Sequence, residues 1–337
     1  MDLEMLQFRA NVMQKIRNFF IERGYLELDT PAMASCLIPE TCLEVFKTEY
    51  IQPWKDKRQE LYLVPSPEVH IKPIIARHKV SVFQLSKCYR NVESKGRLHS
   101  PEFTMLEYYT MNATYLDSAK ITEELFSYIL PAQKNGQKDF FSHLRPPFIR
   151  LAMDDAFTQY AGFRLSECPN ATDLALHAKR LGLVEPQNNP FNNWDWDDLY
   201  ELIFVQCVEP NLPQEKPVFL MDYPAQVPCL AQDVPSKDGK PVWKERWELY
   251  AQGIELSNCY SEETDQDKVR LYFEDESKKK EKTARVPHAT NKDYWKHFKD
   301  FPKCSGNAMG VDRLVALLSG RTSIDGVLPQ EHLVSRH

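Results

Sequence analysis

The stretch that decides the fold reads FQLSKCYRN over residues 83–91 and, after a polar loop, PEFTMLEYY over residues 101–109. Two strand-like runs on either side of that loop predict a long-looped antiparallel hairpin. Alternate side chains of the return strand point to one face, so Phe103, Glu107 and Tyr109 lie together. A carboxylate packed there against an apolar core without a partner would cost several kcal/mol. We therefore expect this face to meet a ligand.

The segment before the hairpin predicts a helix followed by a short strand. Leu6, Ile16 and Phe20 recur at helical spacing, and Gly24 stands where a helix ends. Residues 25–31, YLELDTP, alternate apolar and acidic side chains and end in proline, which is typical of a strand near a sheet edge.

The remaining pattern predicts an α+β fold with a mostly antiparallel sheet flanked by helices. Residues 217–260 are strand-like, and residues 306–319 read as a strand that turns into a helix, with Gly320 as its cap. Strands gather at both ends of the chain without regular βαβ alternation. Residues 115–200 show no chemistry and predict an inserted lobe. Because the chain has neither GxGxxG nor GxxxxGK[ST], we expect side chains and sheet to hold any nucleotide.

The composition excludes several classes of protein. The 337 residues are 42% hydrophobic and 27% charged, as in globular proteins, and the net charge of −6 disfavours a non-specific nucleic-acid binder. No apolar run is long enough to span a bilayer, so we expect no membrane association and a cytoplasmic location. The eight cysteines form no CxxC pair. The lysines at 278–280 predict a solvated helix face.

A second hairpin is expected around Gln252-Gly253. A two-residue turn there makes Tyr250 face Glu255 and places Glu248 diagonally on the same face, about 7 to 8 Å away. Two carboxylates at that spacing are within joint reach of a magnesium ion.

The residues after this turn require an irregular strand. Asn258, Tyr260 and Glu262 share one face, but their parity is opposite to that of Glu255. A β-bulge must intervene if all four side chains reach one pocket.

Ser66-Pro67-Glu68 predicts a helix start, with Ser66 as the cap and Pro67 at the first helical position. Glu68 then lies in the first turn, where acids are favoured in any helix.

Three segments resemble the motifs of class II aminoacyl-tRNA synthetases, specifically the lysyl branch. Residues 20–31 are similar to motif 1, YRN at 89–91 with RLH at 97–99 and PEFT at 101–104 to motif 2, and CSGNAMGVDRL at 304–314 to motif 3. The resemblance implies one class II catalytic domain over residues 1–330, with 115–200 as the insertion. Motif 1 begins within about 20 residues of Met1, so we expect no N-terminal anticodon-binding barrel.

The resemblance implies an ATP-dependent enzyme that forms an aminoacyl adenylate. Arg90 and Arg313 are the implied catalytic residues, on the α- and γ-phosphates. Glu248 and Glu255 are the implied Mg²⁺ ligands. The implied ATP-binding set is Arg90, Asn91, Glu93, His99, Phe103, Glu255, Leu256, Gly310 and Arg313.

The implied substrate is lysine or β-lysine. Glu68 would bind its primary amine, Glu262 its ε-ammonium, and Asn258 its carboxylate. Ala308 stands where lysyl-tRNA synthetases have glycine and the protein-modifying relatives have alanine. The implied substrate-binding set is Ser66, Pro67, Glu68, Glu107, Tyr109, Asn258, Tyr260, Glu262 and Ala308.

The stand-alone layout resembles the lysyl-synthetase relatives that attach β-lysine to a lysine of elongation factor P. Two alternatives stay open: a truncated lysyl-tRNA synthetase, which the net charge disfavours, and a catalytically silent paralogue that binds as a regulatory subunit. Val92, in place of the usual glutamate, favours the latter. The resemblance also implies a homodimer formed through motif 1. Pro73 departs from the family by interrupting a helix.

Overall fold

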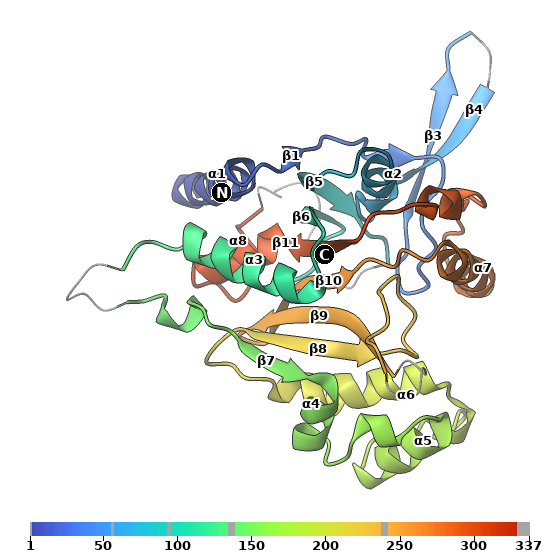
Figure 1. The fold of residues 1–337 in the computed structure, drawn as a ribbon. Coiled ribbons are helices and arrows are strands. Elements are labelled where there is room, and N and C mark those ends of the chain that lie inside the picture. The colour runs from blue at the N-terminus through green and yellow to red at the C-terminus, as the bar shows by residue number, and fades with distance from the viewer. Residues whose placement is uncertain (1, 55–56, 93–95, 134–138, 237–241, 329–337) are drawn as a thin grey trace. The chain divides into compact units, whose positions relative to one another are not determined.

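The computed structural model describes residues 2–54, 57–92, 96–133, 139–236 and 242–328. The chain divides into two compact units (Figure 1). Unit 1 comprises residues 1–118 and 262–337, and unit 2 comprises residues 119–261.

Unit 1 begins with the expected helix, α1 (Leu3–Glu22). The Asp2 carboxylate accepts a hydrogen bond from the Glu4 N–H and caps it. Phe20 is fully buried and packs on Phe83, with ring centroids 5.1 Å apart. Gly24 follows with φ +76°, which ends the helix as predicted.

The sheet of unit 1 has the strand order β1-β5-β6-β11. Its members are β1 (Leu26–Glu27), β5 (Val82–Tyr89), β6 (Glu102–Met111) and β11 (Cys304–Gly310). The β5–β6 hairpin is confirmed, and β1 pairs with β5 at one edge. β11 lies antiparallel to β6, so the middle strand places Glu107 between Gln84 and Ala308. Helix α8 (Val311–Leu318) follows β11 directly (Figure 1).

The other elements of unit 1 lie between these strands in the sequence. Three strands form a small antiparallel sheet: β2 (Met33–Ala34), β3 (Phe46–Gln52) and β4 (Lys57–Leu63). Helix α2 (Glu68–His78) precedes β5, and α7 (Gln266–Thr283) and the short 3₁₀-helix η6 (Tyr294–Phe298) precede β11.

Unit 2 has the strand order β10-β9-β8-β7, in which only β7 and β8 are parallel. Its strands are β7 (Ile149–Ala152), β8 (Val218–Pro224), β9 (Trp243–Ala251) and β10 (Ile254–Ser261). Helix α3 (Tyr115–Ile129) leads into the unit. The α-helices that follow are α4 (Met153–Tyr160), α5 (Ala171–Arg180) and α6 (Trp196–Ile203). The unit also has four short 3₁₀-helices, η1 (Ser142–Leu144), η2 (Leu165–Glu167), η3 (Phe191–Asn193) and η5 (Glu209–Asn211), and a π-helix, η4 (Phe204–Val208), among its described residues.

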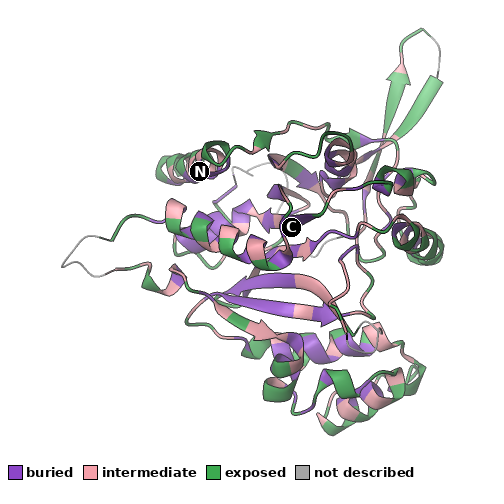
Figure 2. Ribbon diagram, viewed as in Figure 1, coloured by how far each residue is buried: buried purple, intermediate pink, exposed green. Residues whose placement is uncertain are grey.

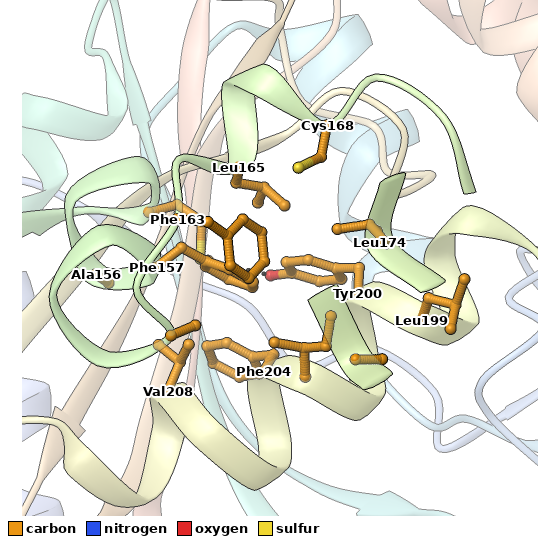
Figure 3. Close-up of a cluster of buried hydrophobic side chains, with 14 of the residues drawn as sticks. Ala156, Phe157, Phe163, Leu165, Cys168, Leu174, Leu199, Tyr200, Phe204 and Val208 are labelled. Carbon is orange, nitrogen blue, oxygen red and sulfur yellow. Dashed lines mark hydrogen bonds between the residues drawn. The ribbon is translucent and has the colours of Figure 1, made fainter. Parts of the chain in front are cut away.

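The helices of unit 2 enclose a core of their own. Phe157, Tyr200 and Phe204 stack at its centre, with centroid distances of 5.7 and 5.9 Å (Figure 3). Both β8 and the second half of β9 are mostly buried (Figure 2). Unit 2 therefore contains most of the predicted insertion together with the three later strands.

The predicted α+β class is confirmed, since both units combine mostly antiparallel strands with helices. No helix among the described residues is both long enough and apolar enough to cross a membrane.

The solvated lysine face predicted on α7 is wrong for one residue. Lys278 and Lys279 have exposed side chains, but Lys280 is buried. Its ammonium donates to the backbone carbonyls of Glu40, at 2.7 Å, and of Leu43. Lys280 therefore fixes the segment before β3 to α7.

Candidate active site

Glu107 lies in the middle of β6 and is buried with only 2% of its surface exposed. The Ser66 hydroxyl donates to its Oε1, and the Tyr109 hydroxyl donates to its Oε2 at 3.1 Å. Burial, followed by the charge of Glu68, raises the pKa of Glu107 to about 8. The carboxyl predicted to need a partner thus has two, and at neutral pH it is mostly protonated.

Ser66, Pro67 and Glu68 stand at the start of α2. The Glu68 N–H donates to Ser66 Oγ at 3.1 Å, but Pro67 occupies the N-cap position, so the prediction of Ser66 as the cap is wrong. The first helical residue is Glu68 rather than Pro67, because the helix begins one position later than expected. Ser66 therefore links the helix start to Glu107.

Helix α2 runs through Pro73, so the predicted interruption is wrong. Proline lacks the N–H that would bond the carbonyl of Val69, four residues earlier. The Tyr294 hydroxyl donates to that carbonyl at 3.3 Å and to the Glu68 carbonyl at 3.4 Å. The orphaned acceptor is thus satisfied from η6, which also fixes the helix start.

Lys72 was not predicted, yet it lies at the centre of the acidic residues. Its side chain is completely buried, and its ammonium forms ion pairs with Glu68 and, at 2.8 Å, with Glu262 Oε2. Burial raises the pKa of Glu262, and the charge of Lys72 opposes the shift. We call Glu68, Glu107, Glu262 and Lys72 the acidic cluster.

The backbone of β11 closes one side of the acidic cluster. Ala308 is paired with Glu107, and Gly306 with Tyr109. A Cβ on Gly306 would lie 2.2 Å from Glu262 Oε1 and 2.6 Å from Tyr109 Cε1. Only glycine leaves room there for both side chains.

Arg90 follows β5, and its guanidinium Cζ lies 5.2 Å from the Phe103 ring centroid. Its Nε is buried and has no hydrogen-bond partner among the described residues. A buried donor of this kind fits an anion such as a phosphate. The neighbouring Asn91 amide donates to the Val45 carbonyl at 3.2 Å, which supports the segment structurally. Glu93 lies outside the described residues.

Arg313 lies in the first turn of α8, beside His99. Its Nη2 is 2.9 Å from His99 Nε2, and its Nε donates to the Leu98 carbonyl at 3.2 Å. The structure therefore brings together two residues of the predicted ATP-binding set. Gly310, the last residue of β11, is paired with Met105.

The preceding residue, Asp312, fixes the start of α8. It accepts from Arg9 Nη1 at 2.6 Å and from the Thr104 N–H at 2.7 Å, and Arg9 Nη2 also donates to Thr104 Oγ1 at 2.8 Å. This buried network holds α8, α1 and β6 together, and it thereby positions Arg313.

In unit 2, the predicted β9–β10 hairpin and its bulge are confirmed. Gln252 and Gly253 have φ of 51° and 72°, as a two-residue turn requires, and Tyr250 faces Glu255. The register then shifts between Glu255 and Ser257, so that Leu256 is the extra residue.

The bulge brings the substrate residues onto the face of the predicted metal ligands. Asn258 becomes paired with Glu248, and Tyr260 with Arg246. Tyr250 and Glu248 lie two residues apart on β9, so the side chains of both pairs project from the face that Glu255 shares.

Arg246 organises this face, although the sequence reading missed it. Its Nη2 donates to Glu248 Oε1 at 2.7 Å and its Nε to Asn258 Oδ1 at 3.2 Å, while the Tyr250 hydroxyl donates to Glu248 Oε2 at 2.8 Å. Each carboxylate oxygen keeps a further lone pair. Oxygen atoms are the ligands that a hard divalent cation prefers, so Glu248 keeps the capacity to bind one, and Glu255 shares its face of the hairpin.

Comparison with known proteins agrees with this architecture. A family model described as tRNA synthetases class II (D, K and N) matches residues 2–330, and the chain belongs to that family. Among curated relatives, the elongation factor P--(R)-beta-lysine ligase of Yersinia enterocolitica is 33% identical, over 95% of this chain and 92% of the relative. The ligase of the same name from Vibrio atlanticus is 32% identical, over 96% and 94%. The resemblance inferred from the three motifs is therefore confirmed.

Proposed function

We propose that the chain is an ATP-dependent ligase that activates lysine or β-lysine as an aminoacyl adenylate and transfers it to a lysine side chain of elongation factor P. The observation that carries this proposal is the acidic cluster, in which Glu68 and Glu262 are two buried carboxylates, because two such groups suit a substrate with two amino groups. The names of the relatives support the acceptor and the lysine-type substrate.

In the first step, a carboxylate oxygen of the amino acid attacks the α-phosphorus of ATP and diphosphate leaves. Negative charge gathers on the phosphate oxygens, and guanidinium groups stabilise it. Arg90 is proposed for the α-phosphate, since its buried Nε is available as a donor. Arg313 and His99 are proposed for the γ-phosphate, and Phe103 for stacking on adenine.

In the second step, the neutral ε-amine of the acceptor lysine attacks the carbonyl carbon of the adenylate. The C–O bond to the phosphate breaks, AMP leaves, and the new amide nitrogen loses a proton. Positioning carries most of the rate in such a transfer. Mg²⁺, held by Glu248 and Glu255, would supply charge neutralisation for the phosphates.

The remaining residues complete the proposed binding sites. Glu68 and Glu262 take the two amines, with Tyr109, Glu107 and Ser66 beside them. Pro67 and Ala308 border the substrate. Asn258 takes the carboxylate and Tyr260 packs on the aliphatic stem. Asn91, Leu256 and Gly310 line the nucleotide through their backbones, and Glu93 is proposed to contact adenine.

Two further proposals accompany the activity. We propose a homodimer through α1 and β1, where Ile21 and Leu26 are each 53% exposed. Sedimentation at several concentrations tests it, and a monomer at all of them contradicts it. The cytoplasmic location stays a prediction.

Mass spectrometry tests the ligase proposal directly. Elongation factor P is incubated with the protein, ATP, Mg²⁺ and either α-lysine or one β-lysine enantiomer, and we expect one aminoacyl mass on one lysine. Arg90→Ala should abolish the addition, whereas Arg58→Ala, at a side chain 63% exposed, should preserve it. Charging of tRNA instead would favour a truncated synthetase. Absence of diphosphate exchange with every diamino acid would favour a silent paralogue.

A further inference from the structure

We propose that Lys72 is a positioning residue that sets the separation of Glu68 and Glu262, and with it the spacing of amino groups that the enzyme prefers in its substrate. The inference rests on the proposed function, in which these two carboxylates receive the two amines. Lys72 touches neither the nucleotide nor the reacting carboxylate in this scheme, so it acts through its partners.

The geometry begins with one ammonium shared by two acids. Lys72 and Glu68 are four residues apart on α2, and Glu262 reaches the same Nζ at 2.8 Å from a segment far along the chain. Charge-assisted bonds are about 2.7 to 2.9 Å long, so two oxygens on one ammonium lie within about 6 Å of each other. The side chain of Lys72 therefore limits how far the carboxylates separate.

The surroundings keep this arrangement in place. The Lys72 side chain has no exposed surface, and Glu262 has 1%. Gly306 brings the β11 backbone against Glu262 Oε1, while the Tyr294 hydroxyl fixes the Glu68 carbonyl. Neither acid can turn toward solvent without breaking these contacts, so the shared ammonium of Lys72 determines their spacing.

Diamino acids differ in the separation of their two amino groups, and the spacing of the two carboxylates would select among them by that separation. The amino groups of α-lysine are on C2 and C6, with a chain of five carbons, whereas those of β-lysine are on C3 and C6, with four. Ornithine carries amines on C2 and C5, which gives the shorter spacing with an α-amino group. One methylene is discriminated by about 10- to 200-fold in a fitted site. A comparison with ornithine therefore distinguishes an effect of the spacing between the amino groups from an effect of the carbon that carries the first amine.

Removal of the ammonium should widen the gap, because two buried carboxylates without a shared cation repel each other. We expect Lys72→Met, which keeps the stem, to lower the affinity for β-lysine and ornithine relative to α-lysine by at least about 10-fold. Lys72→Arg keeps the charge but reaches farther, so it should shift the same ratios in the same direction by a smaller factor.

Calorimetric dissociation constants for the three diamino acids provide the test. Lys279→Met is the matched control, since Lys279 forms an i,i+3 ion pair on α7 with a 52% exposed side chain, and we expect unchanged ratios. Ratios within twofold of wild type in folded Lys72→Met would overturn the inference, as would unchanged ratios in Lys72→Arg if the methionine variant does not fold. A wild-type protein that binds none of the three would instead refute the proposed function.

Discussion

Gly306→Ala tests whether β11 closes the acidic cluster as described. The added methyl would meet Glu262 Oε1 at 2.2 Å, whereas ordinary contact begins at 3.4 Å, so 3.4 − 2.2 = 1.2 Å of displacement is required. The strand cannot move freely because Gly306 is paired with Tyr109, and Glu262 is held by Lys72. Overpacking of this kind costs about 1–3 kcal/mol of unfolding free energy.

The same displacement should affect activity. A misplacement of about 1 Å can reduce a rate by about 100-fold, so we expect kcat/KM for the diamino acid in diphosphate exchange to fall by that order. Urea unfolding measures the stability loss in parallel. Gly96→Ala is the stability control, because its Cβ would meet only His99 Nδ1, at 4.0 Å. A Gly306→Ala protein with the unfolding free energy of wild type and a kcat/KM within twofold of wild type would contradict the close approach of Gly306 to Glu262.

Three further predictions concern Arg90, Glu107 and Asp312. Arg90→Lys should lower kcat in diphosphate exchange about 100-fold, because lysine cannot present a planar fork; an unchanged kcat excludes the α-phosphate role. The pKa of Glu107 is raised from 4.5 to about 8, so the folded state holds a proton that the unfolded state releases, and this contribution to stability is full below pH 4.5 and lost as the pH rises to 8. Between pH 4.5 and pH 8, Glu107→Gln should therefore reduce the loss of unfolding free energy with pH by up to about 1.4 kcal/mol per pH unit, as measured by urea titrations. The same slope of unfolding free energy against pH in the variant and in wild type would contradict the raised pKa. Asp312→Leu should cost about 3–5 kcal/mol of unfolding free energy by leaving the buried charge of Arg9 without its carboxylate, and adding Arg9→Met should restore most of it; no recovery would place the loss elsewhere.

Local rules account for what the sequence predicted well. Gln252-Gly253 defines a two-residue turn, and period-two alternation then assigns Glu248 and Glu255 to a common face. The parity conflict with Asn258 required a bulge, which the register contains. Strand and turn chemistry depends on residues a few positions apart, so one sequence suffices to derive it.

Contacts between distant segments were beyond such reasoning. Lys72 reads as an ordinary helix residue until Glu262 is placed beside it, and Lys280 reads as a surface cation until its carbonyl acceptors are known. Pro73 was expected to break a helix, because no nearby residue indicates that the distant Tyr294 hydroxyl donates to the Val69 carbonyl. The i,i+4 spacing of Glu68 and Lys72 was the one local signal available.

Unit 1 is assembled from the two ends of the chain, and this has a consequence for synthesis on the ribosome. Three residues near the start of the chain have partners that are synthesised much later: Lys72 pairs with Glu262, the Val69 carbonyl with Tyr294, and Arg9 with Asp312. A nascent chain that has reached residue 261 has every strand of unit 2 but none of these partners. The place where a diamino acid would be held is therefore created late in translation, and truncated products lack it altogether.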